Sequence, residues 1–410
     1  MQLSTPKWAI AGNLAFCAAI NYADRSALSA VLPALYSEMG LSDMELAALG
    51  SVFLWSYALF SPVAGFLADR WSRSRLIVIS VASWSLVSVA AGFSVNYAML
   101  LTTRILLGLT ESLYLPSATA LIADYHGTSS RGTAMAVHSV GLNLGVVAGG
   151  AGAGYLADHF GWRMGFIVLG GMGLLIAGLS LFFLRDSGAG LPQKAQKHPV
   201  LASVGELARI RSYVVVLAEV MLVATGVWTF FNWLPLYFRD TFQMSLGSAG
   251  FAGTFTLQIA TVAGMVMSGY WSDRLATRSR RNRMLLQSMS FLAAAPFLLV
   301  FRTQPGFLLV SLSIFLFALL RGMGQANDSP VLCDVVPSRL RSTAIGFMNT
   351  CASFSGGLGV FATGYLKSKY GLAGVFSGIS IAFLSAGVIL LAGYRFFSAR
   401  DLLRQGEKQT

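Results

Sequence analysis

The chain has 410 residues, of which 55% are hydrophobic and only 11% charged, and its mean hydropathy is +0.66. Soluble globular proteins carry roughly 25% charged residues, so this composition excludes a water-covered surface and indicates that most of the surface faces the lipid bilayer. The net charge of +12 does not indicate a nucleic-acid partner, because the basic residues fall in short loops that alternate along the chain.

Apolar runs follow one another along the whole chain. A helix needs about 20 apolar residues to cross a bilayer, and twelve such runs lie at about 8–36, 46–68, 76–94, 98–124, 133–157, 164–184, 212–238, 248–271, 284–302, 306–333, 342–366 and 374–396. The one long polar stretch separates the sixth run from the seventh. We therefore predict an all-α membrane protein with a six-helix bundle at 1–184, a cytoplasmic linker at 185–211, a second six-helix bundle at 212–397 and a cytoplasmic tail at 398–410.

The loop charges set the orientation. Lys and Arg are retained on the cytoplasmic side of membrane proteins. With the N-terminus inside, 21 of the 29 Lys and Arg residues fall in inner segments, 5 in outer segments and 3 within spans. We therefore predict that both termini are cytoplasmic, and we expect a monomer in a bacterial inner membrane.

Two segments that lie 210 residues apart share a pattern. Asp124 stands seven residues before Arg131, and Asp334 stands seven before Arg341. The same offset relates Gly154-Tyr155-Leu156 to Gly364-Tyr365-Leu366, Gly161 to Gly371, and Phe166 to Phe376. The chain is therefore a duplicated half, and duplicated membrane transporters are the first class of protein to consider.

A second repeated motif closes the second predicted helix of each half. The residues that form the two copies are Gly65, Asp69, Arg70 and Arg73 in the first, and Gly269, Asp273 and Arg274 in the second. Glycine permits close helix contact, and an aspartate can pair with a cation or with a helix N-terminus on a neighbouring bundle. With Asp124, Arg131, Asp334 and Arg341, these residues are predicted to form a cytoplasmic rim network that holds one state of a two-state machine. The alternative is ordinary loop charge that only sets topology.

This motif resembles the G-x-x-x-D-R-x-G-R-R signature of the major facilitator superfamily, with Ser72 where glycine is usual. The resemblance covers the whole chain, because both copies follow the second helix of a six-helix half. It implies two pseudo-symmetric bundles that move about a central substrate site.

Charged residues also lie inside the predicted spans. They are Asp24 and Arg25 in the first helix, Arg104 and Glu111 in the fourth, and Arg321 and Asp328 in the tenth. Such residues are costly in a membrane and usually face the bundle interior, where they mark a substrate or ion path. Residues seven apart share a helix face, about 10 Å along the axis, so Arg104 is predicted to share a face with Glu111, and Arg321 with Asp328.

Adjacent residues on a helix point about 100° apart, so Asp24 and Arg25 need different partners. We expect crossed pairs, Asp24 with Arg104 and Arg25 with Glu111, or one shared cluster of four charges. The alternative is a purely structural ion network that joins the first and fourth helices. Glu219, about two turns into the seventh helix, is interpreted as a rim residue.

The segment Asn21-Tyr22-Ala23-Asp24-Arg25, with Arg104, Glu111 and the run Phe53-Leu54-Trp55-Ser56-Tyr57, resembles the anion:cation symporter family. By this resemblance Arg25 and Arg104 hold a substrate carboxylate, Tyr57 bonds to it, and Asp24 and Glu111 take the coupled protons. Tyr22, Arg321 and Asn349 are further candidates for substrate binding, and Asp328 is a further candidate for proton coupling. The same signals resemble the spinster-like lipid carriers. The glutamine expected near Leu142 in a sugar-acid carrier is absent, which disfavours hydroxyl-rich substrates.

We therefore predict a secondary active transporter that moves a small organic anion, a monocarboxylate, together with protons by alternating access. The main alternative is a spinster-like transporter of lysolipids or sphingoid lipids, or a drug exporter. A sensor on a carrier fold is a further class, disfavoured because neither end carries a signalling domain. We expect no enzyme, no cofactor and no metal, since the sequence shows only four histidines and no metal-ligand spacing, nucleophile motif or nucleotide loop.

Overall fold

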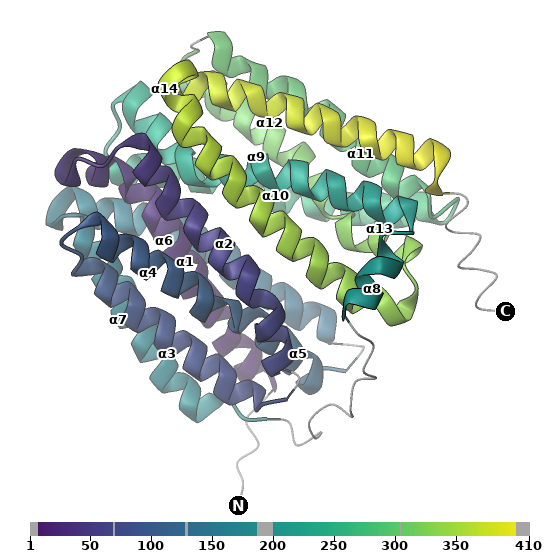
Figure 1. The fold of residues 1–410 in the computed structure, drawn as a ribbon, viewed down its shortest axis with the longest axis horizontal. Helices are drawn as coiled ribbons and strands as arrows, with labels where there is room; N and C mark the ends of the chain where they lie inside the picture. Colours follow the sequence, from purple (N-terminus) through teal and green to yellow (C-terminus); the bar gives the residue numbers. More distant parts are fainter. Residues whose placement is uncertain (1–6, 69, 128–129, 187–199, 304, 399–410) are drawn as a thin grey trace, which may run out of the picture. The chain divides into compact units, whose positions relative to one another are not determined.

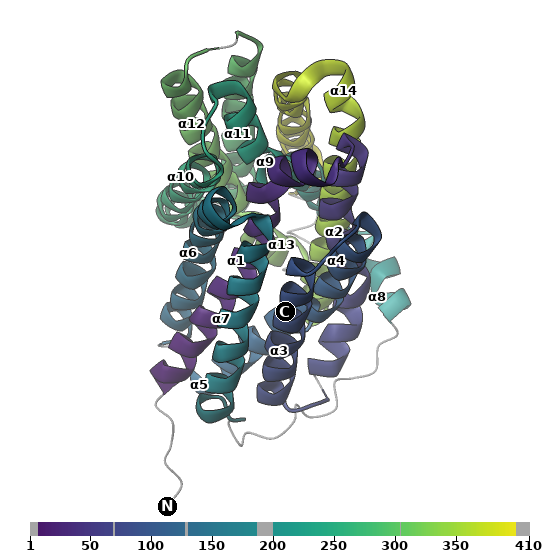
Figure 2. The same ribbon diagram turned by 90° about the vertical axis from the view of Figure 1, so that its left-hand side faces the viewer.

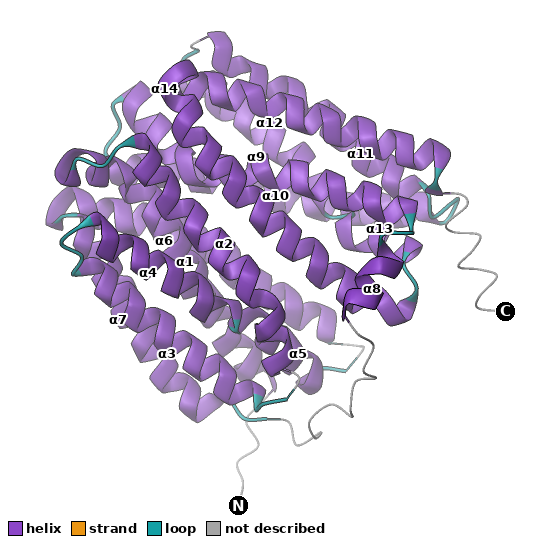
Figure 3. Ribbon diagram, viewed as in Figure 1, coloured by secondary structure: helices purple, strands orange, loops and turns teal. Residues whose placement is uncertain are grey.

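A computed structural model describes residues 7–68, 70–127, 130–186, 200–303 and 305–398. Every element within these ranges is helical (Figure 3), as the all-α prediction requires. Asp69, residues 187–199 of the predicted linker and nearly all of the predicted tail lie outside the described residues.

Seven helices precede the predicted linker. They are α1 (Lys7–Met39), α2 (Asp43–Ala68), α3 (Arg73–Gly92), α4 (Tyr97–Ser112), α5 (Tyr114–Tyr125), α6 (Arg131–Phe160) and α7 (Trp162–Phe183). Helices α4 and α5 together fill the fourth predicted span, which is interrupted at Leu113.

The remaining elements follow a short helix, α8 (Val200–Leu207). They are α9 (Arg211–Phe242), α10 (Leu246–Ala276), α11 (Asn282–Ala294), η1 (Ala295–Thr303), α12 (Phe307–Gln325), α13 (Asp328–Val335), η2 (Ser338–Leu340) and α14 (Arg341–Phe396). Figure 1 colours the chain by sequence position, and these elements run from teal through green to yellow.

The number of spans agrees with the sequence. In the described part of the chain, ten continuous helical stretches are long and apolar enough to cross a membrane. One of them, α14, holds two spans, because Gly371 breaks it with φ of 65°, a backbone conformation that favours glycine. Gly161, its partner in the duplication, has φ of 83° and ends α6. Adding α1, a helix of 33 residues, gives the twelve predicted spans.

The chain divides into two compact units. The first unit comprises residues 1–195 and 231–255, and the second comprises 196–230 and 256–410. In the first unit α1 lies between α6 and α7, α3 packs along α7, and α2 packs along α4 (Figure 2). In the second unit α11 packs against both α12 and α14.

Helices α1 and α6 approach closely through small residues, as membrane helices commonly do. Three glycines of α6 at intervals of four residues face three alanines of α1: Gly141 faces Ala15, Gly145 faces Ala19, and Gly149 faces Ala23. A Cβ atom on Gly145 would lie 2.6 Å from the Ala19 Cα. This contact fixes α1 against α6 and thereby sets the depth and rotation of Asp24, the residue after Ala23.

Replacing Gly145 by Ala is expected to destabilise the protein by about 1–3 kcal/mol, because overpacking forces the backbones apart. Gly152 lies on the same helix, and an added Cβ there would meet no atom of another described element within 4 Å. Gly152→Ala is therefore the matched control, with a gain of up to about 1 kcal/mol from helix propensity. Thermal unfolding in detergent measures both, and equal effects of the two substitutions would contradict the close packing of α1 on α6.

Candidate functional site

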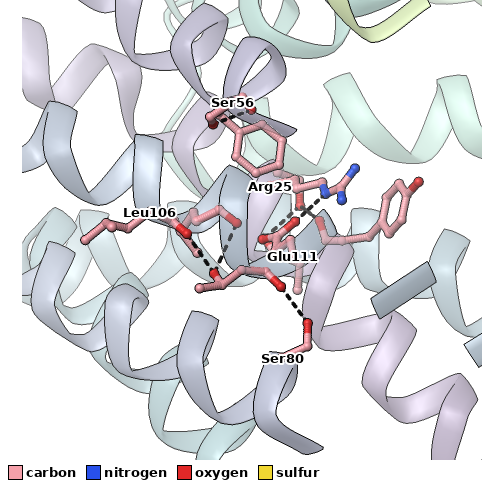
Figure 4. A network of polar contacts seen from close by, with 11 residues as sticks. Arg25, Ser56, Ser80, Leu106 and Glu111 are labelled. Carbon is pink, nitrogen blue, oxygen red and sulfur yellow. Dashed lines mark hydrogen bonds and ion pairs between the residues drawn. The ribbon is translucent and has the colours of Figure 1, made fainter. Parts of the chain in front are cut away.

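An ion pair joins α1 to α4 in the interior of the first unit. Arg25 Nε donates to Glu111 Oε2 at 2.7 Å, and the two side chains are only 7% and 1% exposed. Figure 4 shows the guanidinium of Arg25 extended toward the carboxylate. One of the two predicted crossed pairs is thus formed directly.

Three aromatic rings surround the Arg25 guanidinium. Its central carbon lies 4.7 Å from the Tyr22 ring centroid, 5.0 Å from that of Phe53 and 4.8 Å from that of Tyr57. A cation over ring faces is stabilised more strongly where water is excluded. The pair with Glu111 uses one of the five N–H donors of the guanidinium, so further donors remain beside the Tyr57 ring for an incoming acceptor.

Gly108 lets α2 approach α4 at this point. A Cβ there would collide with the Ser56 hydroxyl and the Phe53 carbonyl oxygen, and would lie 2.9 Å from the Tyr57 amide nitrogen. The Ser56 hydroxyl itself donates to the Phe53 carbonyl at 3.0 Å. Close approach of the two backbones therefore brings the rings of α2 to the ion pair.

The turn of α4 that precedes Glu111 is held by hydroxyl groups (Figure 4). The Thr110 hydroxyl donates to the Leu106 carbonyl at 2.8 Å, within α4. The Ser80 hydroxyl of α3 donates to the Thr110 carbonyl at 2.6 Å. These bonds connect α3 to the backbone next to Glu111 and limit the movement of its carboxylate.

Asp24 and Arg104 lie beside the ion pair but do not complete it. Asp24 is 1% exposed, and within the described ranges neither of its oxygens has a hydrogen-bond partner. It interacts electrostatically with Glu111 and Arg104, and the Ser88 hydroxyl of α3 faces it. Asp24 and Arg104 form no direct ion pair among the described residues, so the four charges make one shared cluster with one direct pair.

Arg104 is buried beside an aromatic ring. Its side chain is 2% exposed, its guanidinium lies 5.1 Å from the Phe166 ring centroid, and its Nε and Nη2 atoms have no partner among the described residues. Buried polar groups are nearly always hydrogen-bonded. A cluster with a free carboxylate and free guanidinium nitrogens is therefore incomplete and has the chemistry to accept an anion and a proton.

The second unit has its own buried polar cluster. Arg321 is 7% exposed; its Nη1 donates to Gln325 Oε1 at 2.9 Å and its Nη2 donates to the Thr261 hydroxyl. Arg321 and Asp328, which were predicted to share a helix face, lie on successive helices, because α12 ends at Gln325 and α13 begins at Asp328. They still interact electrostatically. Asn349 lies on α14 with an exposed side chain.

Gln287 of α11 links two acidic residues that the sequence did not predict to lie together. Its Nε2 donates to Asp328 Oδ1 at 2.7 Å and to Glu219 Oε2 at 3.2 Å. Glu219, which was interpreted as a rim residue, is 1% exposed and takes part in this buried contact. Sequence reasoning missed Gln287 because it is uncharged, although an amide in an apolar span was a signal.

The predicted rim residues form matching ion pairs in the two units. Arg73 pairs with Asp124, and Arg283 pairs with Asp334 at 3.1 Å. Each pair joins residues 51 apart, and the second pair is the first displaced by 210. Arg283 also pairs with Asp273 at 3.0 Å. Sequence reasoning missed Arg283, which the duplication of Arg73 would have identified.

The other rim residues have more local contacts. Arg70 lies over the Phe66 ring at 3.4 Å, and Arg274 Nη1 donates to the Tyr270 hydroxyl at 3.4 Å. A Cβ on Gly65 or Gly269 would meet nothing within 4 Å among the described residues, so the close helix contact expected at these glycines is not formed there.

Arg131 and Arg341 cap equivalent helices. Each donates to backbone carbonyls five and eight residues earlier: Arg131 to His126 at 3.4 Å and Ala123 at 3.5 Å, and Arg341 to Val336 at 3.3 Å and Cys333 at 2.8 Å. Cations near the carbonyl end of a helix are stabilising. Both arginines therefore stabilise the ends of the preceding helices, α5 and α13.

Removing the carboxylate in Glu111→Ala is expected to destabilise the protein by about 3–5 kcal/mol, because the Arg25 charge stays buried without its partner. Removing both charges in Arg25→Met/Glu111→Leu should recover most of the lost stability. Thermal unfolding in detergent is the measurement.

The control for that experiment is the exposed pair Arg339–Glu206, whose side chains are 51% and 37% exposed. Glu206→Ala should change stability by no more than about 1 kcal/mol. An effect of Glu111→Ala as small as that of Glu206→Ala would show that the inner pair is not desolvated.

Comparison with known protein families agrees with this architecture. The family model of the Major Facilitator Superfamily matches residues 14–360 and, a second time, residues 220–408. The overlapping second match is what an internal duplication produces.

Similar proteins of bacterial origin span almost the same length. The hexuronate transporter of Bacillus subtilis (strain 168) is 27% identical over 383 residues, which cover 90% of this chain and 88% of that protein. The cis,cis-muconate transport protein of Acinetobacter baylyi is 27% identical over 401 residues, which cover 95% of this chain and 94% of that protein.

Solved structures share the fold at lower identity. A bacterial homologue of the human lysosomal transporter Spinster, in an inward-facing and unoccupied conformation, has a TM-score of 0.77 and 20% identity and covers 98% of this chain and 99% of that one. A D-xylose–proton symporter has a TM-score of 0.75 and 15% identity, and the match covers 95% of this chain and 97% of that one.

Proposed function

This chain belongs to the major facilitator superfamily, and from that premise we propose that it transports a small organic anion with one carboxylate, coupled to protons. The observation that carries the proposal is the incomplete charge cluster of the first unit. It combines a carboxylate on Asp24 with guanidinium nitrogens on Arg104 that have no hydrogen-bond partner in the described part of the chain.

The guanidinium groups supply the anion site. Guanidinium and carboxylate match in geometry and form strong, often two-pronged hydrogen bonds. Arg104 has two nitrogens without a partner, and Arg25 keeps donors that Glu111 does not use. We propose that a substrate carboxylate binds these two residues, with the Tyr22 and Tyr57 rings around it.

Charge balance supports coupling to protons. Two guanidiniums and two carboxylates make the empty cluster neutral. Protonating one carboxyl leaves one positive charge, which one substrate carboxylate neutralises. Moving an unbalanced charge through a low-dielectric path costs several kcal/mol, so one anion and one proton travel together most readily.

Asp24 is the better first proton acceptor of the two carboxylates. Among the described residues its carboxylate forms no ion pair, so a proton can bind there without breaking one. Glu111 is held by Arg25. In our proposal, a proton on Glu111 would release Arg25, so the second carboxyl links proton uptake to the freedom of a substrate ligand.

The names of the relatives support an anionic substrate. Hexuronate and cis,cis-muconate both carry carboxylates, and both names belong to proteins that align over most of this chain. The likeness to the Spinster homologue concerns the fold. We therefore favour the organic anion over the lysolipid, sphingoid lipid or drug alternative.

Alternating access would act through the rim. We propose that the ion pairs of Arg73 with Asp124 and of Arg283 with Asp334 stabilise one conformation of each unit, and that their opening accompanies the change of state. The capping arginines Arg131 and Arg341 would keep the adjoining helix ends rigid. Arg321, Asn349 and Asp328 remain candidate contributors from the second unit.

Substrate binding should be weakened when Arg104 is changed. Arg104→Ala is expected to weaken carboxylate binding about 10- to 100-fold, which corresponds to one charge-assisted hydrogen bond of about 1.5–3 kcal/mol. Thermal stabilisation of the purified protein by monocarboxylates, sugar acids, dicarboxylates and lysolipids tests this on wild type and variant together. Stabilisation by lysolipids that Arg104→Ala leaves unchanged would favour the lipid alternative.

Coupling should be lost when Asp24 is neutralised. Asp24→Asn cannot release a proton, so proteoliposomes should retain substrate exchange but lose accumulation driven by a pH gradient. Uptake of a radiolabelled carboxylate with and without the gradient is the measurement. Accumulation by Asp24→Asn at the wild-type level would assign coupling to Glu111 or remove it from this cluster.

A further inference from the structure

A second set of polar groups, which includes two carboxylates, lies in the second unit, apart from the cluster used above. Glu219 of α9 is 1% exposed and Gln287 of α11 is 0% exposed, and the half-buried Asp328 opens α13 beside them. Neither carboxylate forms an ion pair among the described residues. Each accepts a hydrogen bond from the same amide nitrogen.

The two carboxylates are close enough to repel each other. Gln287 Nε2 lies 2.7 Å from Asp328 Oδ1 and 3.2 Å from Glu219 Oε2. These two oxygens are therefore no more than about 6 Å apart, a separation at which like charges disfavour joint ionisation. A neutral amide cannot cancel two negative charges.

The hydrogen-bond inventory of the site is one donor short. The Gln287 amide group has two N–H bonds, and it donates to both carboxylates. Gln287 Oε1, buried between these neighbours, has no donor among the described residues. Buried acceptors are nearly always satisfied, so this oxygen indicates a missing hydrogen-bond donor in the site.

The local charges are also out of balance by one. Arg321 is the charged side chain that interacts with this pair among the described residues; it acts on Asp328 through space and makes its hydrogen bonds to Gln325 and Thr261. One guanidinium thus faces two carboxylates. A single added proton restores neutrality and supplies the missing donor.

We propose that Glu219, Gln287 and Asp328 form a second proton-binding site, in the second unit, that holds one proton at neutral pH. A carboxylate oxygen takes the proton and becomes an O–H group, which donates to the other carboxylate or to Gln287 Oε1. The amide directs its N–H bonds at the carboxylates, and this orientation would repel a metal cation but suits a shared proton.

The site would add a proton to the transport cycle. That consequence rests on the proposed function, because it matters only where transport is coupled to protons. Binding of the proton does not rest on the proposed function, because it follows from the charges and hydrogen bonds of the second unit alone. The two statements are therefore tested by different measurements.

Infrared spectroscopy of the purified protein detects the proton directly, through the C=O stretch of a protonated carboxyl. The measurement is made at pH 7 in an Asp24→Asn/Glu111→Gln background, so that the first unit cannot give the signal. The band should be present in that background. It should disappear in Glu219→Gln and in Asp328→Asn, because the one remaining carboxylate balances Arg321 and stays ionised.

Arg321→Met should act in the opposite direction. Without the guanidinium both carboxylates are uncompensated, so the band should increase about twofold. Glu206→Gln, an exposed carboxylate in the same unit, is the control and should leave the band unchanged. If the background variant does not fold, as judged by size-exclusion chromatography, difference spectra of the single variants against wild type replace it.

A band that persists in both Glu219→Gln and Asp328→Asn, or that is absent at pH 7 from the start, overturns the proposal. Stabilisation by sodium ions with no carboxyl band would identify a cation site instead and would also overturn it. In proteoliposomes, the ratio of protons to anions from reversal potentials should fall by one in Glu219→Gln. A normal band with an unchanged ratio would contradict the role in transport, whereas the proton site would stand.

Discussion

The buried ion pair between Arg25 and Glu111 is the interaction on which the site depends. A charge placed in a low-dielectric interior is tolerated only when an opposite charge or hydrogen bonds compensate it. The pair brings α1 and α4 together at the depth where α2 adds its rings and α3 its hydroxyl groups. The same constraint makes the neighbours informative, since Asp24 and Arg104 are just as buried and less well compensated.

The two units keep the same rim geometry but differ in the interior. The rim pairs and the arginine caps recur at an offset of 210, with the same spacing between partners. In the interior, Glu111 of the first unit corresponds to Arg321 of the second. The first cluster therefore balances two positive and two negative charges, whereas the second has one positive and two negative. Because the rim ion pairs match, the two units can make equivalent movements. Because the buried charges differ, the two units can bind different ligands.

Much of the fold and part of the site followed from the sequence. Apolar length predicted the spans within a few residues, because hydropathy depends on composition and not on packing. The pairing of Arg25 with Glu111 followed from helix geometry and the cost of burial. The missing Asp24–Arg104 contact could not be predicted, since it depends on helix packing. The end of α12 at Gln325 was not predicted from the sequence. Gln287 was also not predicted, because the search for site residues considered charged side chains and Gln287 is neutral.

In the proposed mechanism, the arrangement of charges would also limit which anions the first cluster can bind. Protonation of Asp24 removes a carboxylate that has no direct partner, so it leaves the Arg25–Glu111 pair intact. A dianion would need a second proton for neutrality, and within this cluster that proton must go to Glu111 and break the pair that orders Arg25. The proton site that we propose in the second unit would change this balance, because it would take up a proton without disturbing the proposed anion ligands. In the two proposals together, the charge of the cargo would depend on both units, while Arg25 and Arg104 of the first unit would hold its carboxylate.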